Sequence, residues 1–208
     1  MTRARFITLE GGEGVGKSTQ LVALAAALRA RGLDVVETRE PGGSPGAEAI
    51  RQLLLQGSED RWTAESEALL FAAARADHVA RTIKPALAAG QWVISDRFID
   101  SSVAYQGIVG HVGADAVRQL HAIGSHGFLP DRTFLLRLEN RAAAERARAR
   151  DTEGSDRIGG REQAFHDRIG FAFGVIANEE PERVRPIDAA GAPEAVTARL
   201  LAALEDLL

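Results

Sequence analysis

Short apolar runs alternate along the chain with longer stretches rich in Ala, Leu and Arg. Short apolar runs bounded by turn formers are typical of buried strands, and the longer stretches have the length and composition of helices. Strands that alternate with helices in this way predict a parallel sheet joined by crossover helices. We expect strands near 5–9, 34–38, 91–95, 132–138 and 183–187.

The segments between these strands predict helices. Gly32, Gly90 and Gly124 stand where glycine commonly ends a helix. The segment 151–160 is rich in turn formers and predicts a mobile loop. No linker or repeat interrupts the plan, so we predict a single α/β domain over 1–208. The expected helices span 17–31, 47–55, 65–89, 113–124, 140–150, 161–179 and 192–207.

Residues 11–18, Gly-Gly-Glu-Gly-Val-Gly-Lys-Ser, fit the pattern G-x-x-x-x-G-K-[ST] between a predicted strand and a predicted helix. Glycines let the backbone wrap around a phosphate with its N–H groups inward, and the helix adds its positive end. Lys17 would reach the β- and γ-phosphates, and the Ser18 hydroxyl would hold Mg²⁺. The predicted nucleotide-binding residues are Gly11, Gly12, Glu13, Gly14, Val15, Gly16, Lys17, Ser18 and Thr19.

The basic residues support this phosphate site. The chain has 25 basic residues, of which only Lys17 and Lys84 are lysines. A lysine supplies the compact ammonium that phosphate chemistry uses at this position, so its occurrence there is informative.

The overall charge and the N-terminal segment exclude several classes of protein. A net charge of −4 argues against a general nucleic-acid binder. The apolar run behind the basic N-terminus stops at Glu10, too short for a signal peptide or a membrane span. The chain has no cysteine, which fits a reducing compartment. We expect a cytoplasmic protein that binds neither nucleic acid nor membrane.

Polar residues follow the predicted strands, and ligands of open parallel sheets bind beyond the carboxyl ends of strands. The second strand leads into Arg39-Glu40-Pro41-Gly42-Gly43, which alone would be a surface turn with a solvated ion pair. The third strand ends at Asp96 and Arg97. These residues are either a carboxylate that binds magnesium beside an arginine that binds phosphate, or a pair with a structural role. The polar cluster at 100–107 has no strand or helix period, so it is either a plain polar loop or a site for a base edge.

Two sets of residues lie on predicted helices. Phe71 and Arg75 stand four apart and share a face, where an aromatic is usually core and an arginine usually solvated. Arginines crowd the segment around the predicted loop, and at least one of them is expected to stabilise a transferring phosphoryl group. The others would be solvated or paired with acidic neighbours. These arginines are Arg141, Arg146, Arg148, Arg150, Arg157 and Arg161.

Taken together, these residues resemble the thymidylate kinase family, which phosphorylates dTMP with ATP. The resemblance implies a P-loop three-layer α/β sandwich, a five-stranded parallel sheet flanked by helices, with a short lid over about 141–160. It rests on the order and spacing of Phe6-Ile7-Thr8-Leu9-Glu10-Gly11, Arg39-Glu40-Pro41-Gly42-Gly43, Phe71-x-x-x-Arg75, Asp96-Arg97-Phe98, Ser101-Ser102-x-x-Tyr105-Gln106-Gly107 and the arginine-rich stretch ahead of Asp156-Arg157.

The resemblance implies roles for residues that would bind the base of dTMP. Phe71 would stack on the thymine ring, and Arg75 would donate to a thymine carbonyl oxygen. Ser101 or Ser102, with Gln106 nearby, would read the rest of the pyrimidine edge.

It also implies contacts to the sugar and the phosphate of dTMP. Tyr105 would crowd the 2′ position and favour deoxyribose, and Glu13 would contact the 3′-hydroxyl. Arg97, Arg51 and the turn 39–43 would hold the phosphate.

The resemblance further implies how charge is neutralised during transfer. Asp96 would help Ser18 to order Mg²⁺. Some family members carry an arginine in the phosphate loop at the position of Gly14; its absence here implies the bacterial type, with the catalytic arginine in the lid. Arg150 is the first candidate and Arg146 the second, acting with Lys17, Arg97 and Arg39.

Two alternatives remain beside this hypothesis. Another monophosphate kinase, acting on dUMP, CMP or a purine nucleotide, is disfavoured by Phe71, Arg75 and Tyr105. A nucleotide-dependent switch is disfavoured because the chain lacks an Asn-Lys-x-Asp motif.

The resemblance also implies a homodimer, because the family is commonly dimeric. Ala- and Leu-rich faces around 65–89 and 113–124 could form an isologous interface, although an internal core explains them equally well.

Overall fold

The strands form one parallel sheet in the order β2-β3-β1-β4-β5. The computed structural model describes residues 3–139, 143, 157–159 and 162–208. Every predicted strand is confirmed, with its ends shifted by at most one residue. The strands are β1 (Phe6–Glu10), β2 (Val35–Arg39), β3 (Trp92–Asp96), β4 (Arg132–Arg137) and β5 (Val184–Asp188).

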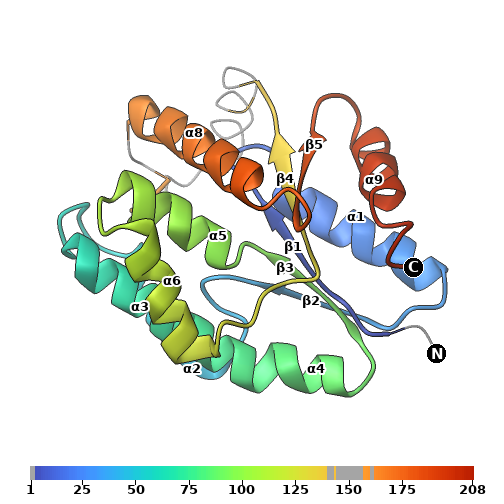
Figure 1. Cartoon of the computed structure of the whole chain (residues 1–208), viewed down its shortest axis with the longest axis horizontal. Helices are drawn as coiled ribbons and strands as arrows, with labels where there is room; N and C mark the ends of the chain where they lie inside the picture. The colour runs from blue at the N-terminus through green and yellow to red at the C-terminus, as the bar shows by residue number, and fades with distance from the viewer. Residues whose placement is uncertain (1–2, 140–142, 144–156, 160–161) are drawn as a thin grey trace.

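Helices cover both faces of the sheet, as the sequence predicts. Figure 1 shows α1 and α9 together on one side of the strands, with α5, α6 and α8 on the other. The described helices are α1 (Lys17–Ala30), α2 (Pro45–Leu55), α3 (Ala64–His78), α4 (Lys84–Ala88), α5 (Ile99–Ser102), α6 (Ala114–Ser125), α8 (Gln163–Glu179) and α9 (Pro193–Ala202), with the π-helical segments η1 (Val79–Ile83) and η2 (Val103–Val109).

Two segments differ from the sequence expectation. The single helix expected over 65–89 is interrupted by the wider turn of η1, which precedes Pro85. Proline lacks an N–H and its ring clashes with the carbonyl four residues earlier, so a regular α-helix cannot continue through it. The polar cluster at 100–107 is helical, within α5 and η2, and is not a plain loop. Except for Ala143 and 157–159, the expected helix 140–150 and loop 151–160 lie outside the described residues.

The prediction that Gly124 ends a helix is wrong. Helix α6 continues past it, and His126 takes the left-handed conformation with φ 55°. A Cβ atom on Gly124 would lie 3.3 Å from the Cβ of Ala76, so the glycine permits close contact between α6 and α3. Gly32 and Gly90, by contrast, follow their helices with φ of 84° and 83°, as predicted.

The core consists of two apolar layers, one on each face of the sheet. Successive strand residues point to opposite faces. Phe6 and Leu135 therefore pack against one set of helices, whereas Ile7 and Phe134 pack against α1 and α9. Both faces of the central strands are buried, which explains why the strands read as continuous apolar runs in the sequence.

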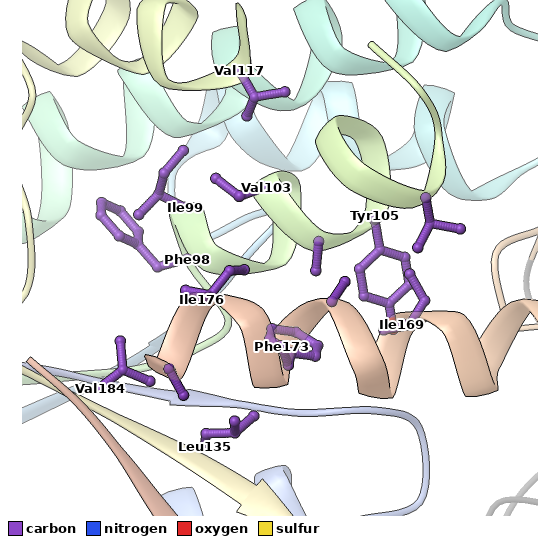
Figure 2. Close-up of a cluster of buried hydrophobic side chains, with 14 of the residues drawn as sticks. Phe98, Ile99, Val103, Tyr105, Val117, Leu135, Ile169, Phe173, Ile176 and Val184 are labelled. Atoms are coloured by element: carbon purple, nitrogen blue, oxygen red, sulfur yellow. The ribbon is translucent and has the colours of Figure 1, made fainter. Parts of the chain in front are cut away.

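Apolar side chains of α8 support the segment that follows β3. Figure 2 shows Ile169 and Phe173 of α8 beneath Val103 and Tyr105 of η2. The ring of Tyr105 lies 6.3 Å from the ring of Phe173 in an edge contact. Helix α8 thus fixes the height of η2 above the sheet.

A buried carboxyl group joins β1 to the turn after β3. Glu10 Oε1 accepts hydrogen bonds from the backbone N–H groups of Phe98 (2.7 Å) and Ser101 (3.2 Å), and Oε2 accepts from Ser101 Oγ (2.6 Å). Burial, aided by the charge of Asp100, raises the pKa of Glu10 to about 7, although Arg97 and these hydrogen bonds oppose the rise. Glu10 therefore fixes the path of the chain at the carboxyl edge of the sheet.

No helix in the described part of the chain is both long enough and apolar enough to cross a membrane.

We expect Phe134→Ala to lower the free energy of unfolding by about 3–5 kcal/mol, because Phe134 is fully buried and its loss leaves a cavity. Urea denaturation followed by circular dichroism measures the change. Phe171, which is 74% exposed, provides the matched control, and Phe171→Ala should change the value by less than about 0.5 kcal/mol. Equal losses in the two variants would contradict this assignment of the core.

We expect Glu10→Gln to change how stability depends on pH. The folded-state pKa of about 7 lies above the ordinary 4.5, so the folded wild type binds the proton more tightly and loses stability as pH rises between these values. Glutamine keeps the acceptor and cannot ionise. The free energy of unfolding of the variant relative to wild type should therefore rise across this window, by on the order of 3 kcal/mol at most. Urea melts at several pH values test this, and a pH-independent difference would refute it.

Candidate functional site

A cavity of about 390 Å³ lies where β1, β2 and β3 end. The parallel strands bring their carboxyl ends to one edge, so residues distant in sequence meet there. Leu55 and Ile158, which the sequence analysis did not name, also line the cavity. The predicted site residues that line it are Glu13, Gly14, Gly16, Lys17, Ser18, Arg39, Arg51, Phe71, Arg75, Asp96, Arg97, Ser101, Ser102, Tyr105 and Gln106.

The loop between β1 and α1 has a conformation that glycine makes possible. Gly11 has φ 134°, and a Cβ atom there would lie 2.6 Å from the carbonyl oxygen of Leu136. Lys17 Nζ donates to the carbonyl oxygens of Gly11 (3.1 Å) and Gly12 (2.7 Å). Burial, with the charge of Arg97, lowers the pKa of Lys17, against the effect of nearby carboxylates. The ammonium is thus held over the loop at the edge of the cavity.

Ser18 and Asp96 form the oxygen pair that the sequence predicted for Mg²⁺. Ser18 Oγ donates to Asp96 Oδ2 at 2.9 Å. A hydroxyl and a carboxylate suit Mg²⁺, which binds few protein groups and takes its remaining ligands from water and phosphate oxygens. Across the described residues, no cluster of three or more His, Cys, Asp or Glu could hold a metal on its own. The donor set therefore fits an ion that arrives with a nucleotide.

Arg97 lies at the centre of the site. Its Nη2 donates to Glu13 Oε1 (2.6 Å) and Tyr105 Oη (3.3 Å), and its Nη1 donates to Ser101 Oγ (3.0 Å) and the Gly11 carbonyl (3.2 Å). Burial alone would lower the pKa of Arg97, but Tyr105 and the nearby carboxylates raise it above its ordinary value. The guanidinium is therefore a fixed positive charge.

The backbone at Arg97 is unusual for a residue with a side chain. Its φ is 71°, in the left-handed region that favours glycine. Such conformations persist where the surroundings hold them, often at functional sites. Here the contacts of the guanidinium and the backbone bonds around β3 fix the turn.

Tyr105 presents a protonated hydroxyl to the cavity. Burial raises the pKa of Tyr105 to about 12, against the lowering effect of Arg97. Its ring contacts Phe165 at a centroid distance of 5.9 Å, which holds the side chain in place.

Arg75 is buried and held by protein groups on two of its three nitrogen atoms. Nε donates to Glu40 Oε2 (2.8 Å), and Nη2 donates to Ser102 Oγ (2.7 Å). The guanidinium lies 5.4 Å from the ring centroid of Phe98. In the described part of the protein Nη1 has no hydrogen-bond partner, so Arg75 can offer one further donor to the cavity.

Glu40 also lines the cavity, and the environment expected for it from the sequence is wrong. It is buried, and Oε1 lies 3.0 Å from His78 Nδ1 in addition to its bond with Arg75. The solvated ion pair that the isolated motif suggested is therefore wrong, since Arg39 pairs with Glu48 instead. The motif Arg39-Glu40-Pro41-Gly42-Gly43 was the only feature of the sequence that marked Glu40. The spacing of residues within this motif could not indicate that its partners lie on α3.

The remaining predicted residues are placed as follows. Phe71 is half-buried at the cavity, and Arg51 Nη1 donates to the Pro41 carbonyl oxygen at 2.7 Å. Arg39 is half-exposed at the rim. Arg146 and Arg150 lie outside the described residues.

A second cavity, of about 370 Å³, lies on the other side of the phosphate loop. Val15 and Thr19 line it together with Ala189, Gly191, Pro193 and Val196. The sequence analysis did not name the last four. The feature of the sequence that could have indicated them is their position after β5, because the segments that follow parallel strands lie at the same edge of the sheet.

Comparisons with known proteins agree with this architecture. Residues 9–200 match the family model described as thymidylate kinase. A thymidylate kinase of Rhizorhabdus wittichii is 66% identical over 204 residues, covering 98% of each chain. One of Caulobacter vibrioides is 48% identical over 202 residues, covering 96% of this chain and 95% of its own.

A solved structure gives the same result. The crystal structure of thymidylate kinase from Ehrlichia chaffeensis superposes with a TM-score of 0.79 at 31% identity, covering 97% of this chain and 99% of that one. The family match extends over nearly the whole chain and includes the end of β1, the strands β2 to β5 and the residues that line both cavities. The chain belongs to the thymidylate kinase family.

Proposed function

We propose that this chain transfers the γ-phosphoryl group of ATP to dTMP, giving dTDP and ADP on the route to dTTP. One observation carries the proposal: a single cavity holds both the phosphate-loop lysine, Lys17, and the aromatic and arginine pair Phe71 and Arg75. Such a cavity suits a transfer between two phosphorylated ligands, because the acceptor is bound within reach of the phosphate loop.

Residues on α3, α5 and η2 are proposed to bind the thymine base. Phe71 would stack on the ring, and Arg75 Nη1, which has no partner among the described residues, would donate to a carbonyl oxygen. Ser102 holds Arg75 at 2.7 Å and stands with Ser101 and Gln106 at the same wall. These groups would read the pyrimidine edge.

Residues around Arg97 are proposed to bind the sugar and the phosphate. Tyr105 would crowd the 2′ position, and Glu13, 2.6 Å from Arg97, would accept from the 3′-hydroxyl. Arg97, with Arg51 and Arg39 at the rim, would hold the phosphate of dTMP.

ATP is proposed to bind with its phosphates at 11–19 and its adenosine part in the second cavity. Gly14 and Gly16 of the phosphate loop line both cavities, which supports this arrangement. Ser18 and Asp96 would hold Mg²⁺, which when bound neutralises charge on the phosphate oxygens. Because the phosphate loop has Gly14 where some family members have an arginine, an arginine of the lid would complete the site. Arg150 is the first candidate for this role and Arg146 the second.

The reaction would be a direct in-line displacement. An oxygen of the dTMP phosphate attacks the γ-phosphorus, a P–O bond forms, and the bond to the β-phosphate oxygen breaks to release ADP. The phosphate groups of ATP and dTMP are both anionic and must approach each other. Lys17 and Arg97 would offset their repulsion and hold the reacting groups in line. No covalent enzyme intermediate is required.

We also propose that the chain acts as one kinase domain over 1–208 with a lid over about 141–160, and that it forms a homodimer. The exposed Leu69 on α3 and Ile123 on α6, which is 77% exposed, support an interface on the helices that the sequence suggested. A cytoplasmic location remains the sequence-based prediction.

The proposed function is tested by ADP release from ATP and Mg²⁺ with dTMP, dUMP, UMP, CMP, AMP or GMP as acceptor. Stimulation by dTMP above all others is expected. Stimulation by a different monophosphate would overturn the assignment of the base site. Acceptor-independent hydrolysis alone would favour a nucleotide switch.

We expect Lys17→Ala and Arg97→Ala each to lower kcat/KM more than about tenfold, a loss of at least ~1.4 kcal/mol of transition-state stabilisation. Both charges offset phosphate repulsion. Lys84, which lies 5.5 Å from the ring of Phe128 and away from the cavities, is the matched control. Lys84→Ala should leave kcat/KM within about twofold of wild type, and near-wild-type turnover of either site variant would refute that residue's role.

We expect Phe71→Ala to raise KM for dTMP by about 10- to 100-fold, because an aromatic side chain stacked on a base contributes about 1–3 kcal/mol. KM for ATP should change little. Initial rates with each nucleotide varied in turn measure both constants, with Phe171→Ala as the exposed control. An equal loss of affinity for dTMP and ATP would show a general packing role instead.

A further inference from the structure

A buried ion pair lies directly behind the cavity. The side chain of Arg157 is fully buried and that of Glu67 is 7% exposed, and Arg157 Nη2 donates to Glu67 Oε2. Arg157 Nε and Nη1 donate to the carbonyl oxygens of Leu54 (2.8 Å) and Glu59 (3.1 Å). The guanidinium therefore joins the end of α2 and the segment after it to α3.

The second oxygen of this carboxylate faces the cavity wall. Glu67 Oε1 accepts a hydrogen bond from Gln106 Nε2 at 2.9 Å. The other end of the same amide, Gln106 Oε1, is buried and has no hydrogen-bond partner in the described structure. Gln106 lines the cavity together with Phe71 and Arg75.

The charge of Glu67 determines which way this amide points. A carboxylate held by an arginine is ionised, and an ionised carboxylate only accepts hydrogen bonds. Gln106 must therefore turn its NH₂ group to Glu67, which leaves its carbonyl oxygen as the end of the amide that has no partner among the described residues. A buried acceptor without a partner is unfavourable unless a bound donor satisfies it.

We propose that the Glu67–Arg157 pair is a positioning device that fixes the Gln106 amide, so that the cavity offers an acceptor from Gln106 beside the donor of Arg75. Thymine presents the complementary groups, a carbonyl oxygen next to an N–H. Cytosine presents the reverse, an amino group next to a bare ring nitrogen. The pair thus determines which pyrimidine edge is accepted, although neither residue needs to touch the base.

The backbone around Arg157 strengthens this assignment. Arg157 N donates to the carbonyl oxygen of Leu55 at 3.3 Å, and the neighbouring Ile158 lines the cavity together with Leu55. The same short turn that supplies the buried cation therefore also supplies part of the cavity wall.

The inference rests on the proposed function, and the experiment separates the two. Wild-type turnover of dTMP tests the function. Glu67→Gln tests the inference, because Arg157 would keep the oxygen of a glutamine at 67 and turn its NH₂ group to Gln106, which favours the opposite orientation of the Gln106 amide. We expect KM for dTMP to rise at least tenfold and the ratio of kcat/KM for dTMP over dCMP to fall at least tenfold, with KM for ATP within twofold of wild type.

Glu65→Gln, at an exposed position on the same helix, is the matched control and should change none of these values. The double variant Glu67→Gln/Arg157→Gln removes both charges together and avoids a lone buried guanidinium; the same loss of selectivity is expected. An active wild type with an unchanged dTMP/dCMP ratio in either folded variant would overturn the inference. So would an equal loss of affinity for dTMP and ATP.

A measurement on the wild type alone decides the case if both variants fail to fold. In ¹⁵N-labelled protein saturated with dTMP, the side-chain amide protons of Gln106 should show stronger nuclear Overhauser contacts to the methylene protons of Glu67 than to the imino proton of thymine. The reverse order of intensities would mean the opposite amide orientation and would overturn the proposal.

Discussion

The site depends on one interaction more than on any other, the bonding of the buried Glu10 carboxyl group to the turn after β3. Two backbone N–H groups and the Ser101 hydroxyl converge on this side chain at the end of β1. The turn they fix carries Arg97 in a left-handed conformation. Arg97 in turn holds Glu13 and Tyr105. The phosphate loop and the helical segment after β3 therefore keep a fixed relation because both are tied to the same strand.

A chain of buried polar groups extends this arrangement to α3. Glu40 accepts a hydrogen bond from Arg75, which also donates to Ser102 on α5. Charged hydrogen bonds therefore join the segment after β2 to α3 and α5. Charged groups are costly to bury and become favourable only when their partners are in place. The wall of the cavity is for this reason rigid, and a base entering it meets donors and acceptors that are already oriented.

Much of the fold could be predicted from the sequence because its strands are buried on both faces and appear as uninterrupted apolar runs. The phosphate loop could also be predicted from the sequence, since the whole motif lies within 11–18. Local patterns failed where a distant contact decided the outcome. Gly124 serves the approach of α6 to α3 and does not end a helix. Glu40 is buried by Arg75 and His78, thirty or more positions away, and no spacing within its own segment indicates that.

The cavity is electropositive although the chain carries a net charge of −4. The electrostatic field of these charges extends roughly one Debye length, about 8 Å at physiological ionic strength. It therefore attracts small anions only near the mouth of the cavity. The negative remainder of the surface repels larger polyanions, and capture of nucleotides should slow as salt is added. Positive charge confined to the cavity therefore favours phosphates that are small enough to enter it. The cationic residues lining the cavity are Lys17, Arg39, Arg51, Arg75 and Arg97, against the acidic Glu13, Glu40 and Asp96.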